Sequence, residues 1–193
     1  MSRVPRSFFA RPGTEVAPEL LNAVLVAPGV QGRIVEVEAY MGADDPGSHA
    51  YRGPAPRTEV MFGRPGHLYV YFTYGMHWCA NVVCGEEGTA SAVLLRAVAP
   101  LAGLDLMRSR RPKARRDIDL CNGPAKLASA FGLNGDHGGL DLQRNGAGVR
   151  IVNDGTPPPS TPANAVRVGL TQGADIAWRW AVPGVAEVSR PLL

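Results

Sequence analysis

The sequence predicts a single α+β domain, built on a curved antiparallel β-sheet with flanking helices and a protruding β-hairpin. Several segments alternate apolar and polar residues with the period of two that is typical of strands. Segments with helical spacing are inserted among these strands, which favours a mixed α+β fold. At 193 residues and 45% hydrophobic content, the chain is long enough for one substantial core and short for two. No internal repeat or linker divides it, so residues 1–193 are expected to form one domain.

The N-terminal part is expected to contain a lead-in, a helix and a strand. Residues 1–16 are expected to be loosely ordered, with residues 1–8 as the lead-in proper. Residues 18–25 have a proline near the start, an early acid and apolar residues at helical spacing, and Pro28–Gly29 ends this pattern. These features predict a short packing helix. Residues 33–40 then alternate as a strand.

The strand at 33–40 carries an unusual group of side chains on one face. A period of two places Glu36, Glu38 and Tyr40 together, opposite the apolar residues between them. On the strand alone, a solvated face is the simplest interpretation. The following loop, residues 42–57, is rich in Gly, Pro and Asp and contains His49, and loops of this kind often hold binding residues. A carboxylate held among aromatic rings would be desolvated, which raises its pKa and makes it a better base for activating water.

The most aromatic segment, residues 67–83, is expected to form a hairpin that turns near Gly75. One face of this hairpin is apolar and the other carries tyrosines. Tyr74 and Met76 flank the turn, at an exposed tip. A purely hydrophobic hairpin would explain the apolar face, but it would not readily explain two large side chains at the tip.

The rest of the chain is expected to alternate strands with two helices and a basic run. The basic run, residues 108–116, is interpreted either as a solvated, mobile loop or as a contact with phosphates. Asn122 is expected to cap the second helix, which Pro124 opens and Gly132 ends. The expected elements are a strand at 90–96 ending on Arg96, a helix at 100–108, a helix from 122 to 132, and strands at 149–152, 166–170 and 177–182.

Composition limits the function classes and the compartment. The net charge is +3, and basicity comes almost wholly from arginine, since Lys113 and Lys126 are the only lysines. Arginine favours nucleic-acid binding, although a GC-rich genome would produce the same bias. Three cysteines form no paired framework and lack the spacing of a zinc site, so no metal or cofactor is expected. No apolar run approaches the ~20 residues of a membrane span, and a signal-peptide pattern is missing. A cytoplasmic monomer, nucleoid-associated if bacterial, is therefore expected.

The dispersed motifs of the chain closely resemble the alkyladenine (3-methyladenine, methylpurine) DNA glycosylases. The resemblance covers approximately residues 8 to 190, in order and without large gaps, and it is specific because several separate motifs agree at once. The matching motifs are Val35-Glu36-Val37-Glu38-Ala39-Tyr40, His49, Arg52-Gly53 to Arg57, Met61-Phe62, Leu68-Tyr69-Val70-Tyr71 to Tyr74-Gly75-Met76, Asn81, Leu94-Leu95-Arg96 and Gly123-Pro124-Ala125-Lys126-Leu127.

The resemblance implies a monofunctional enzyme that flips a damaged purine out of duplex DNA and hydrolyses its N-glycosidic bond. The implied enzyme would need no cofactor, and its partner would be double-stranded DNA that contains damaged purines. By position, Glu38 matches the general base that deprotonates the attacking water, and Arg96 matches the residue that helps to hold that water. Glu36 is interpreted as a structural residue paired with an arginine.

The resemblance also implies how the DNA is held. Tyr40, His49 and Tyr71 match the rings that enclose the flipped base, and Asn81 matches the residue that crowds the exocyclic amine of normal guanine. Tyr74 matches the wedge that enters the vacated space, with Met76 beside it. Contacts with the DNA backbone are expected from Arg52, Arg57, Arg108, Arg110, Arg111 and Lys126.

Three alternatives remain open on the sequence alone. Glu36 and Glu38, about 7 Å apart on one strand face, could serve a carbohydrate hydrolase. A non-catalytic binder of single strands would share the aromatic and basic features without needing Glu38. Lys126 could serve as the Schiff-base nucleophile of a lyase, although a structural or phosphate-facing role is favoured by its place at a helix start.

Overall fold

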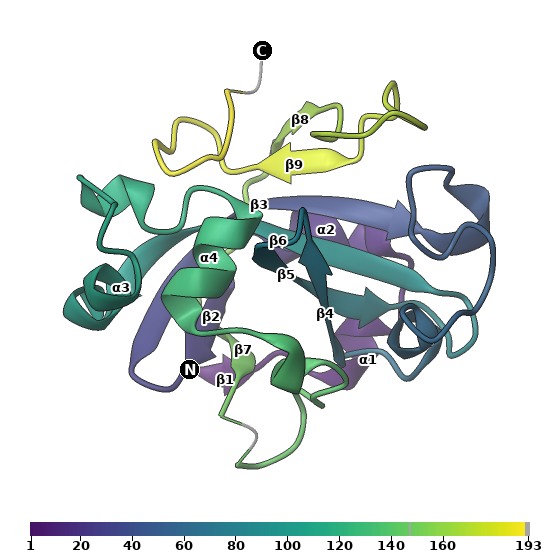
Figure 1. The fold of residues 1–193 in the computed structure, drawn as a ribbon, viewed down its shortest axis with the longest axis horizontal. Helices are drawn as coiled ribbons and strands as arrows, with labels where there is room; N and C mark the ends of the chain where they lie inside the picture. Colours follow the sequence, from purple (N-terminus) through teal and green to yellow (C-terminus); the bar gives the residue numbers. More distant parts are fainter. Residues whose placement is uncertain (147, 192–193) are drawn as a thin grey trace.

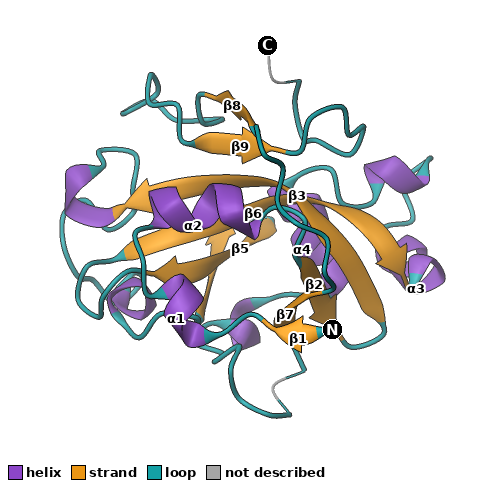
Figure 2. Ribbon diagram, turned by 180° about the vertical axis from the view of Figure 1, so that it is seen from behind, coloured by secondary structure: helices purple, strands orange, loops and turns teal. Residues whose placement is uncertain are grey.

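The fold is one nine-stranded sheet with helices on both of its faces, as the computed structural model describes it for residues 1–146 and 148–191. The expected domain, 1–193, includes residues 147, 192 and 193, which lie outside this description. All strand pairs are antiparallel, and the order is β1-β7-β2-β3-β6-β5-β4, with β9 joined to β3 and β8 joined to β9. Figure 1 shows α4 in front of the sheet, and Figure 2 shows α2 on the opposite face. The α+β prediction is confirmed.

The helices and strands have the following bounds. The strands are β1 Ser2–Arg3, β2 Val24–Ala27, β3 Val30–Met41, β4 Leu68–Thr73, β5 His77–Cys84, β6 Ser91–Ala102, β7 Arg150–Asn153, β8 Ala163–Ala165 and β9 Arg179–Ala181. The α-helices are α1 Arg6–Phe9, α2 Gly13–Leu20, α3 Leu104–Arg110 and α4 Pro124–Phe131. Short 3-10 turns occupy Gly42–Asp44, Glu59–Phe62, Asp117–Asp119 and Gly135–His137.

The two longest strands, β3 and β6, form the centre of the sheet. Their pairing shifts register on both sides of Glu36, which faces Ala97 of β6 and Ala181 of β9. Such β-bulges bend a strand and increase its twist, which accounts for the curvature of the sheet. Both faces of β3 are buried here, which excludes the solvated face that the strand alone would suggest. The two glutamates of β3 are therefore inside the molecule.

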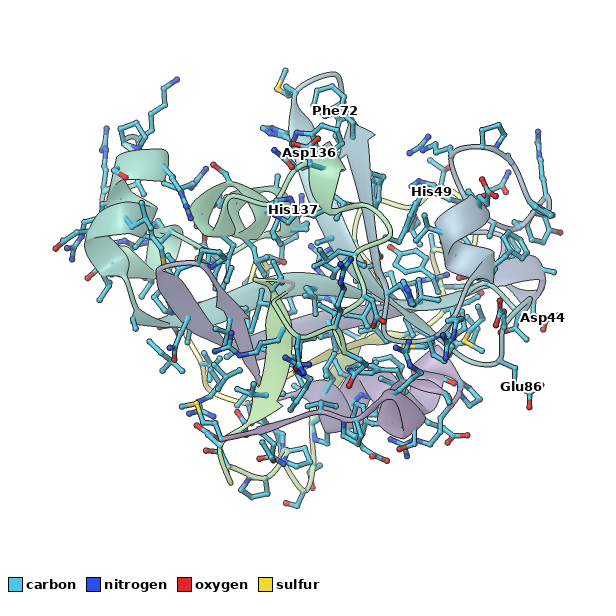
Figure 3. All side chains as sticks on the ribbon, turned by 90° about the horizontal axis from the view of Figure 1, so that it is seen from below. Asp44, His49, Phe72, Glu86, Asp136 and His137 are labelled. Carbon is cyan, nitrogen blue, oxygen red and sulfur yellow. The ribbon has the colours of Figure 1, made fainter. Side chains whose placement is uncertain are left out.

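The predicted hairpin is confirmed. β4 and β5 pair from Leu68–Val82 to Thr73–His77, and Tyr74, Gly75 and Met76 make the turn. Tyr74 and Gly75 both have positive φ, at 51° and 65°. Glycine reaches this region at no steric cost, whereas tyrosine is rarely found there, so the turn holds Tyr74 in an unusual conformation. Figure 3 shows the hairpin projecting from the body of the protein, with Phe72 close to its tip.

The predictions for the first 25 residues were wrong in two places. The N-terminal residues are ordered against the sheet: β1 pairs with β7, and Phe9 is completely buried. The predicted helix at 18–25 ends instead at Leu20, and β2 follows the turn at Asn22, whose φ is 68°. The run from Val24 to Ala27 is buried on both sides, and such a short apolar run has no periodicity that distinguishes a strand from a helix.

Three later elements also differ from the predictions. The strand expected at 90–96 continues to Ala102, so the helix expected at 100–108 begins only at Leu104. Pro100 is tolerated because β5 pairs with β6 only up to Leu94, which leaves a free edge beside the proline. Gly123, rather than Asn122, is the N-cap residue of α4. The strands expected at 149–152 and 177–182 are present as β7 and β9.

The segment at 166–170 is irregular and not the predicted strand. β8 ends at Ala165, and Gly169 has a φ of 78°, which a strand cannot accommodate. The backbone N–H of Val168 is directed away from any ladder and donates to the side chain of Glu38. This departure from regular structure brings the segment to the buried glutamates.

Candidate active site

Glu38 is a completely buried carboxylate with three hydrogen-bond donors around it. The Tyr40 hydroxyl donates to its Oε2 over 2.9 Å, and the Val168 N–H donates to its Oε1 over 2.7 Å. Arg96 Nη1 lies 3.2 Å from the same Oε1. A buried charge is tolerated only when it is paired and hydrogen-bonded, and Glu38 meets both conditions.

Sequence reasoning missed the Val168 amide. A backbone N–H carries no residue signature, so nothing in the sequence could have identified this donor. The hydroxyl of Tyr40, in contrast, contacts Glu38 from a position two residues away on the same face, where the period of two places it. Burial and the neighbouring Glu38 charge raise the pKa of Tyr40, so the phenol keeps its proton and remains a donor.

Arg96 lies between the two glutamates of β3. Its Nε donates to Glu36 Oε1 over 3.0 Å while its Nη1 faces Glu38. Arg179 Nη1 also donates to Glu36 Oε1, over 3.1 Å. The prediction that Glu36 pairs with an arginine is confirmed, and in fact two arginines hold it. The pKa of Arg96 is raised, because the two carboxylates outweigh the effect of burial.

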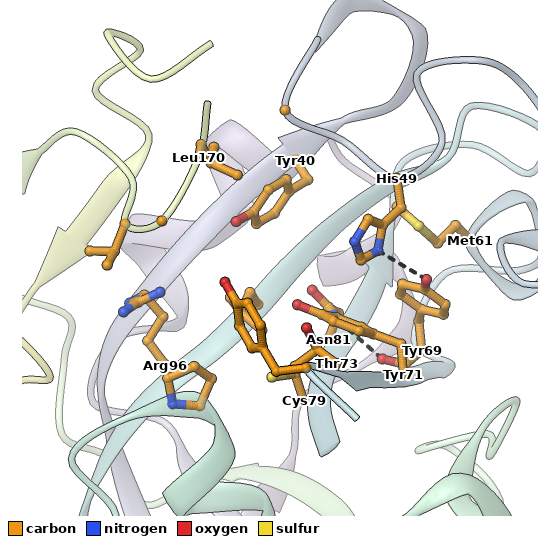
Figure 4. A pocket seen from close by; sticks show the side chains of 16 residues that line it. Tyr40, His49, Met61, Tyr69, Tyr71, Thr73, Cys79, Asn81, Arg96 and Leu170 are labelled. Atoms are coloured by element: carbon orange, nitrogen blue, oxygen red, sulfur yellow. Dashed lines mark hydrogen bonds between the residues drawn. The ribbon is translucent and has the colours of Figure 1, made fainter. Parts of the chain in front are cut away.

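A cavity of about 190 Å³ opens beside this cluster, and four tyrosines and a histidine are among the residues that line it (Figure 4). Tyr40 and Arg96 line it, so Glu38 lies directly behind them. The lining residues are Tyr40, Gly47, His49, Met61, Tyr69, Tyr71, Thr73, Tyr74, Cys79, Asn81, Leu94, Arg96, Pro124, Val168, Gly169 and Leu170. Tyr40, His49, Tyr71, Asn81 and Arg96, which were predicted separately from distant parts of the chain, therefore meet in one place.

The rings of the cavity pack against one another. Tyr69 and Tyr71 stack with centroids 5.5 Å apart, and the His49 ring stands edge-on to Tyr71 at 4.6 Å. Tyr69 is a lining residue that the site prediction left out. The period of two along β4 places it on the same face as Tyr71, so that signal was present in the sequence. Burial raises the pKa of both tyrosines, which keeps them neutral.

His49 is oriented by a partner on each ring nitrogen. Nδ1 lies 3.2 Å from the Tyr69 hydroxyl, and Nε2 lies 3.4 Å from Arg57 Nη2. Because a guanidinium can only donate, Nε2 must accept, and the ring hydrogen must be on Nδ1. The partial burial of the ring and the nearby Arg57 charge lower the pKa of His49 below its ordinary value of 6.5, so the ring is neutral at pH 7.

Replacing Arg57 with Gln should raise the pKa of His49 toward 6.5, because the replacement removes a positive charge beside the ring. NMR titration of the His49 ring would measure this shift.

The lowered pKa of His49 makes the native state bind the ring proton less tightly than the unfolded chain does. The contribution of neutral His49 to the free energy of unfolding should therefore be complete above pH 6.5. It should fall as the pH drops from 6.5 toward the lowered pKa of His49 in the native state. An identical midpoint of the His49 NMR titration in the wild type and in Arg57→Gln would contradict the contact between Arg57 and His49.

Asn81 and Tyr74 both line the cavity, and they differ in exposure. Asn81 is buried on β5, and its amide nitrogen donates to the Tyr69 carbonyl over 3.1 Å. The amide oxygen of Asn81 can still accept a hydrogen bond. Tyr74 is 81% exposed at the hairpin turn, and Met76 beside it is 68% exposed. Asn81 thus lines the cavity and Tyr74 and Met76 lie exposed at the hairpin tip, while their roles toward DNA stay predictions.

The loop that carries His49 is anchored by a second buried ion pair. Arg167 and Asp45 are both 0% exposed, and Arg167 Nη2 donates to Asp45 Oδ1 over 2.7 Å. The Arg167 guanidinium also lies 4.8 Å from the Tyr40 ring centroid. Neither residue was predicted as part of the site, although Arg167 lies in the segment 166–170 that was expected to be a strand. This pair connects the His49 loop to the segment that contains Val168.

The basic residues expected to contact a nucleic-acid backbone mostly have partners within the protein. Arg57 faces His49 and Tyr71 at the cavity, and Lys126 donates to Asn122 over 2.7 Å. In the basic run, Arg108 pairs with Asp105 and Asp117, Arg110 donates to the Ala130 carbonyl, and Arg111 donates to the Asp119 carbonyl. Arg52 is exposed. The backbone contacts of all six residues stay a prediction.

The described part of the chain contains no cluster of three His, Cys, Asp or Glu residues that could hold a metal ion. Cys79, Cys84 and Cys121 are free and buried, and burial raises the pKa of Cys121 to about 12.

In residues 1–146 and 148–191, no helix is both long and apolar enough to span a membrane. Lys126 is not among the residues that line the cavity, which gives no support to a Schiff-base role.

Comparison with known proteins gives one consistent result. The family described as methylpurine-DNA glycosylase matches residues 7–186. A protein of Burkholderia lata is 56% identical over 190 residues, which are 98% of this chain and 92% of the relative. A protein of Streptomyces avermitilis is 49% identical, covering 95% of this chain and 89% of the relative. A protein of Rhodopseudomonas palustris is 47% identical, covering 98% of this chain and 92% of the relative. All three carry the provisional name of 3-methyladenine DNA glycosylase.

Proposed function

Because this chain belongs to the methylpurine-DNA glycosylase family, we propose that it excises alkylated or deaminated purines from duplex DNA. It hydrolyses the N-glycosidic bond as a monofunctional enzyme and so initiates base excision repair. The observation that carries this proposal is the position of Glu38 directly behind Tyr40 and Arg96, which line a cavity rich in tyrosine. A purine inside a duplex is out of reach of these groups, so it must first be turned out of the stack.

The cavity is suited to hold an extruded purine. Flat rings on several sides can stack on a base, and each stacked base contributes about 1–3 kcal/mol. Alkylation at N3 or N7 makes the purine cationic, which strengthens its attraction to electron-rich rings. The neutral state of His49 adds to this, because a protonated ring would repel the same cation. The amide oxygen of Asn81 faces the base, and in this role it disfavours the exocyclic amine of guanine.

Glu38 is the general base in this proposal. A carboxylate has about four lone-pair sites, and Tyr40, Val168 and Arg96 occupy three of them. The remaining site accepts a hydrogen bond from the attacking water. The water oxygen bonds to C1′ of the sugar, Glu38 takes a proton, and the electrons of the broken N-glycosidic bond leave with the purine. A cationic base departs without further help, whereas a neutral deaminated base must be protonated.

A two-carboxylate carbohydrate hydrolase is not supported by the environment of Glu36. Both oxygens of Glu36 already accept hydrogen bonds from Arg96, Arg179 and Ser189. A second carboxylate is therefore not available to activate water on the opposite side of a substrate.

An excision assay tests the proposed function directly. Duplexes with one 3-methyladenine, 7-methylguanine, ethenoadenine or hypoxanthine would be incubated with the protein and analysed with and without alkali. We expect release of the base, and strand breaks only after alkali. Breaks without alkali would indicate a lyase, and no release from any of the four duplexes would refute the glycosylase assignment.

Replacing Tyr74 with Ala should weaken the capture of the flipped base. The exposed Tyr74 side chain at the hairpin tip is positioned to fill the space that the base leaves, which slows its return to the stack. Single-turnover excision should slow, and binding to lesion-containing duplex should weaken. Leu101→Ala, which removes another exposed apolar side chain far along β6, is the matched control. Equal behaviour of the two variants would rule out the wedge role.

Binding to duplex DNA should weaken as salt increases. Each phosphate neutralised by an arginine or lysine contributes about 0.9 to the slope of log affinity against log salt. Arg52→Gln should reduce this slope by about 0.9 if the exposed Arg52 contacts a phosphate. Fluorescence anisotropy over a range of salt concentrations would measure both slopes. A response that does not change with salt would count against DNA as the substrate.

A further inference from the structure

The C-terminal segment, residues 189–191, contacts the buried charged side chains of Glu36, Arg96 and Arg179. The Ser189 N–H donates to Glu36 Oε2 over 2.5 Å, and its hydroxyl donates to Glu36 Oε1 over 2.8 Å. The same hydroxyl oxygen accepts from Arg96 Nη2 over 2.9 Å. Figure 1 shows this segment, in yellow, returning beside β9. Ser189 is thus bonded to both the structural glutamate and the arginine at the cavity wall.

All three nitrogens of the Arg96 guanidinium have different partners. Nε contacts Glu36, Nη1 contacts Glu38, and Nη2 contacts the Ser189 hydroxyl. A guanidinium is a rigid planar fork, so three contacts in three directions determine its orientation. Arg96 consequently presents only one nitrogen to Glu38.

Loss of the Ser189 hydroxyl would remove this restraint. Nη2 would lose its acceptor, and Glu36 would lose one of its donors. An arginine and a carboxylate prefer two parallel N–H···O bonds, so Arg96 would turn both Nη groups toward Glu38. The lone-pair site on Glu38 that the water needs would then be occupied.

We propose that Ser189 is a positioning residue for excision: it holds Arg96 in a single contact with Glu38, so that Glu38 keeps one site for the attacking water. This inference rests on the proposed function. Ser189 lies outside the part of the chain that matches the family, residues 7–186, and it acts on the substrate only through Arg96 and Glu38.

The test compares Ser189→Ala, Ser189→Thr and the control Ser160→Ala, which changes an exposed serine in another loop. Single-turnover excision of hypoxanthine from a duplex is measured with saturating protein, and binding of the same duplex is measured by anisotropy. Ser189→Ala should reduce the rate by ~10- to 100-fold, as expected for the loss of a hydrogen bond to charged groups. DNA affinity should stay within about twofold of wild type, and Ser189→Thr, which retains the hydroxyl, should recover most of the rate.

A double-variant comparison separates positioning from a general loss of structure. Because Ser189 acts through Glu38, adding Ser189→Ala to Glu38→Gln should cause no further loss of rate. A full additional loss in the double variant, or a Ser189→Ala rate equal to that of Ser160→Ala, would overturn the inference. If the wild-type protein excises none of the four lesions, the proposed function itself fails, and this result is distinguishable from both outcomes.

Discussion

Replacing Glu38 with Gln should reduce the single-turnover rate of base excision by about 10²- to 10⁴-fold while damaged DNA is still bound. The amide cannot accept a proton from water, but it has nearly the same shape as the carboxylate. Its oxygen can still accept from the Val168 N–H, and its nitrogen can donate to the Tyr40 oxygen. Stopped or quenched reactions at saturating protein would measure the rate, and anisotropy would measure the binding.

The matched control for this prediction is Glu86→Gln, an exposed glutamate in the turn between β5 and β6. It removes the same charge from the molecule, so any long-range electrostatic effect on DNA binding is retained in the control. A non-catalytic binding protein would show no difference between the two variants. Near-wild-type excision by Glu38→Gln would remove Glu38 from the role of general base.

The parts of the fold that could be predicted are those with a clear period. Val35–Tyr40 of β3 and Leu68–Tyr71 of β4 alternate with a period of two, and both strands are present as expected. Val24 and Leu25, which begin β2, were wrongly included in the predicted helix because this short apolar run is buried on both sides and has no period. Pro100 lies in a strand only because no neighbour pairs with that edge, and this depends on tertiary structure.

The candidate site shows a similar division. Chemically distinctive side chains such as Glu38, Tyr40 and His49 could be singled out as candidates because the resemblance to known DNA glycosylases added to their types and spacing. The Val168 amide and the Ser189 hydroxyl could not, because the first is backbone and the second is an ordinary serine that becomes significant only beside Glu36 and Arg96. The sequence also could not show that Glu38 is completely buried, since both faces of β3 are covered by segments far away in the chain.

Replacing Asp45 with Asn should lower the free energy of unfolding by about 3–5 kcal/mol, the usual cost of breaking a buried ion pair by removing one partner. Asp45 and Arg167 are completely buried, and the carboxylate also accepts from the backbone N–H of Gly47. The substitution would leave the Arg167 charge uncompensated, and Arg167 Nε already has no partner in the described structure. Thermal unfolding should shift down by about 2–4 °C for each kcal/mol lost.

Asp105→Asn is the control for this change, because Asp105 forms an exposed pair with Arg108, which also pairs with Asp117. Surface pairs of this kind contribute little, so its unfolding midpoint should not move. An unchanged midpoint for Asp45→Asn would show that the buried pair is unimportant. The double variant Asp45→Leu/Arg167→Met should recover stability, because an apolar pair of similar volume leaves no unpaired charge. It should not recover excision, because the His49 loop and the Val168 segment would no longer be joined at the position that Glu38 requires.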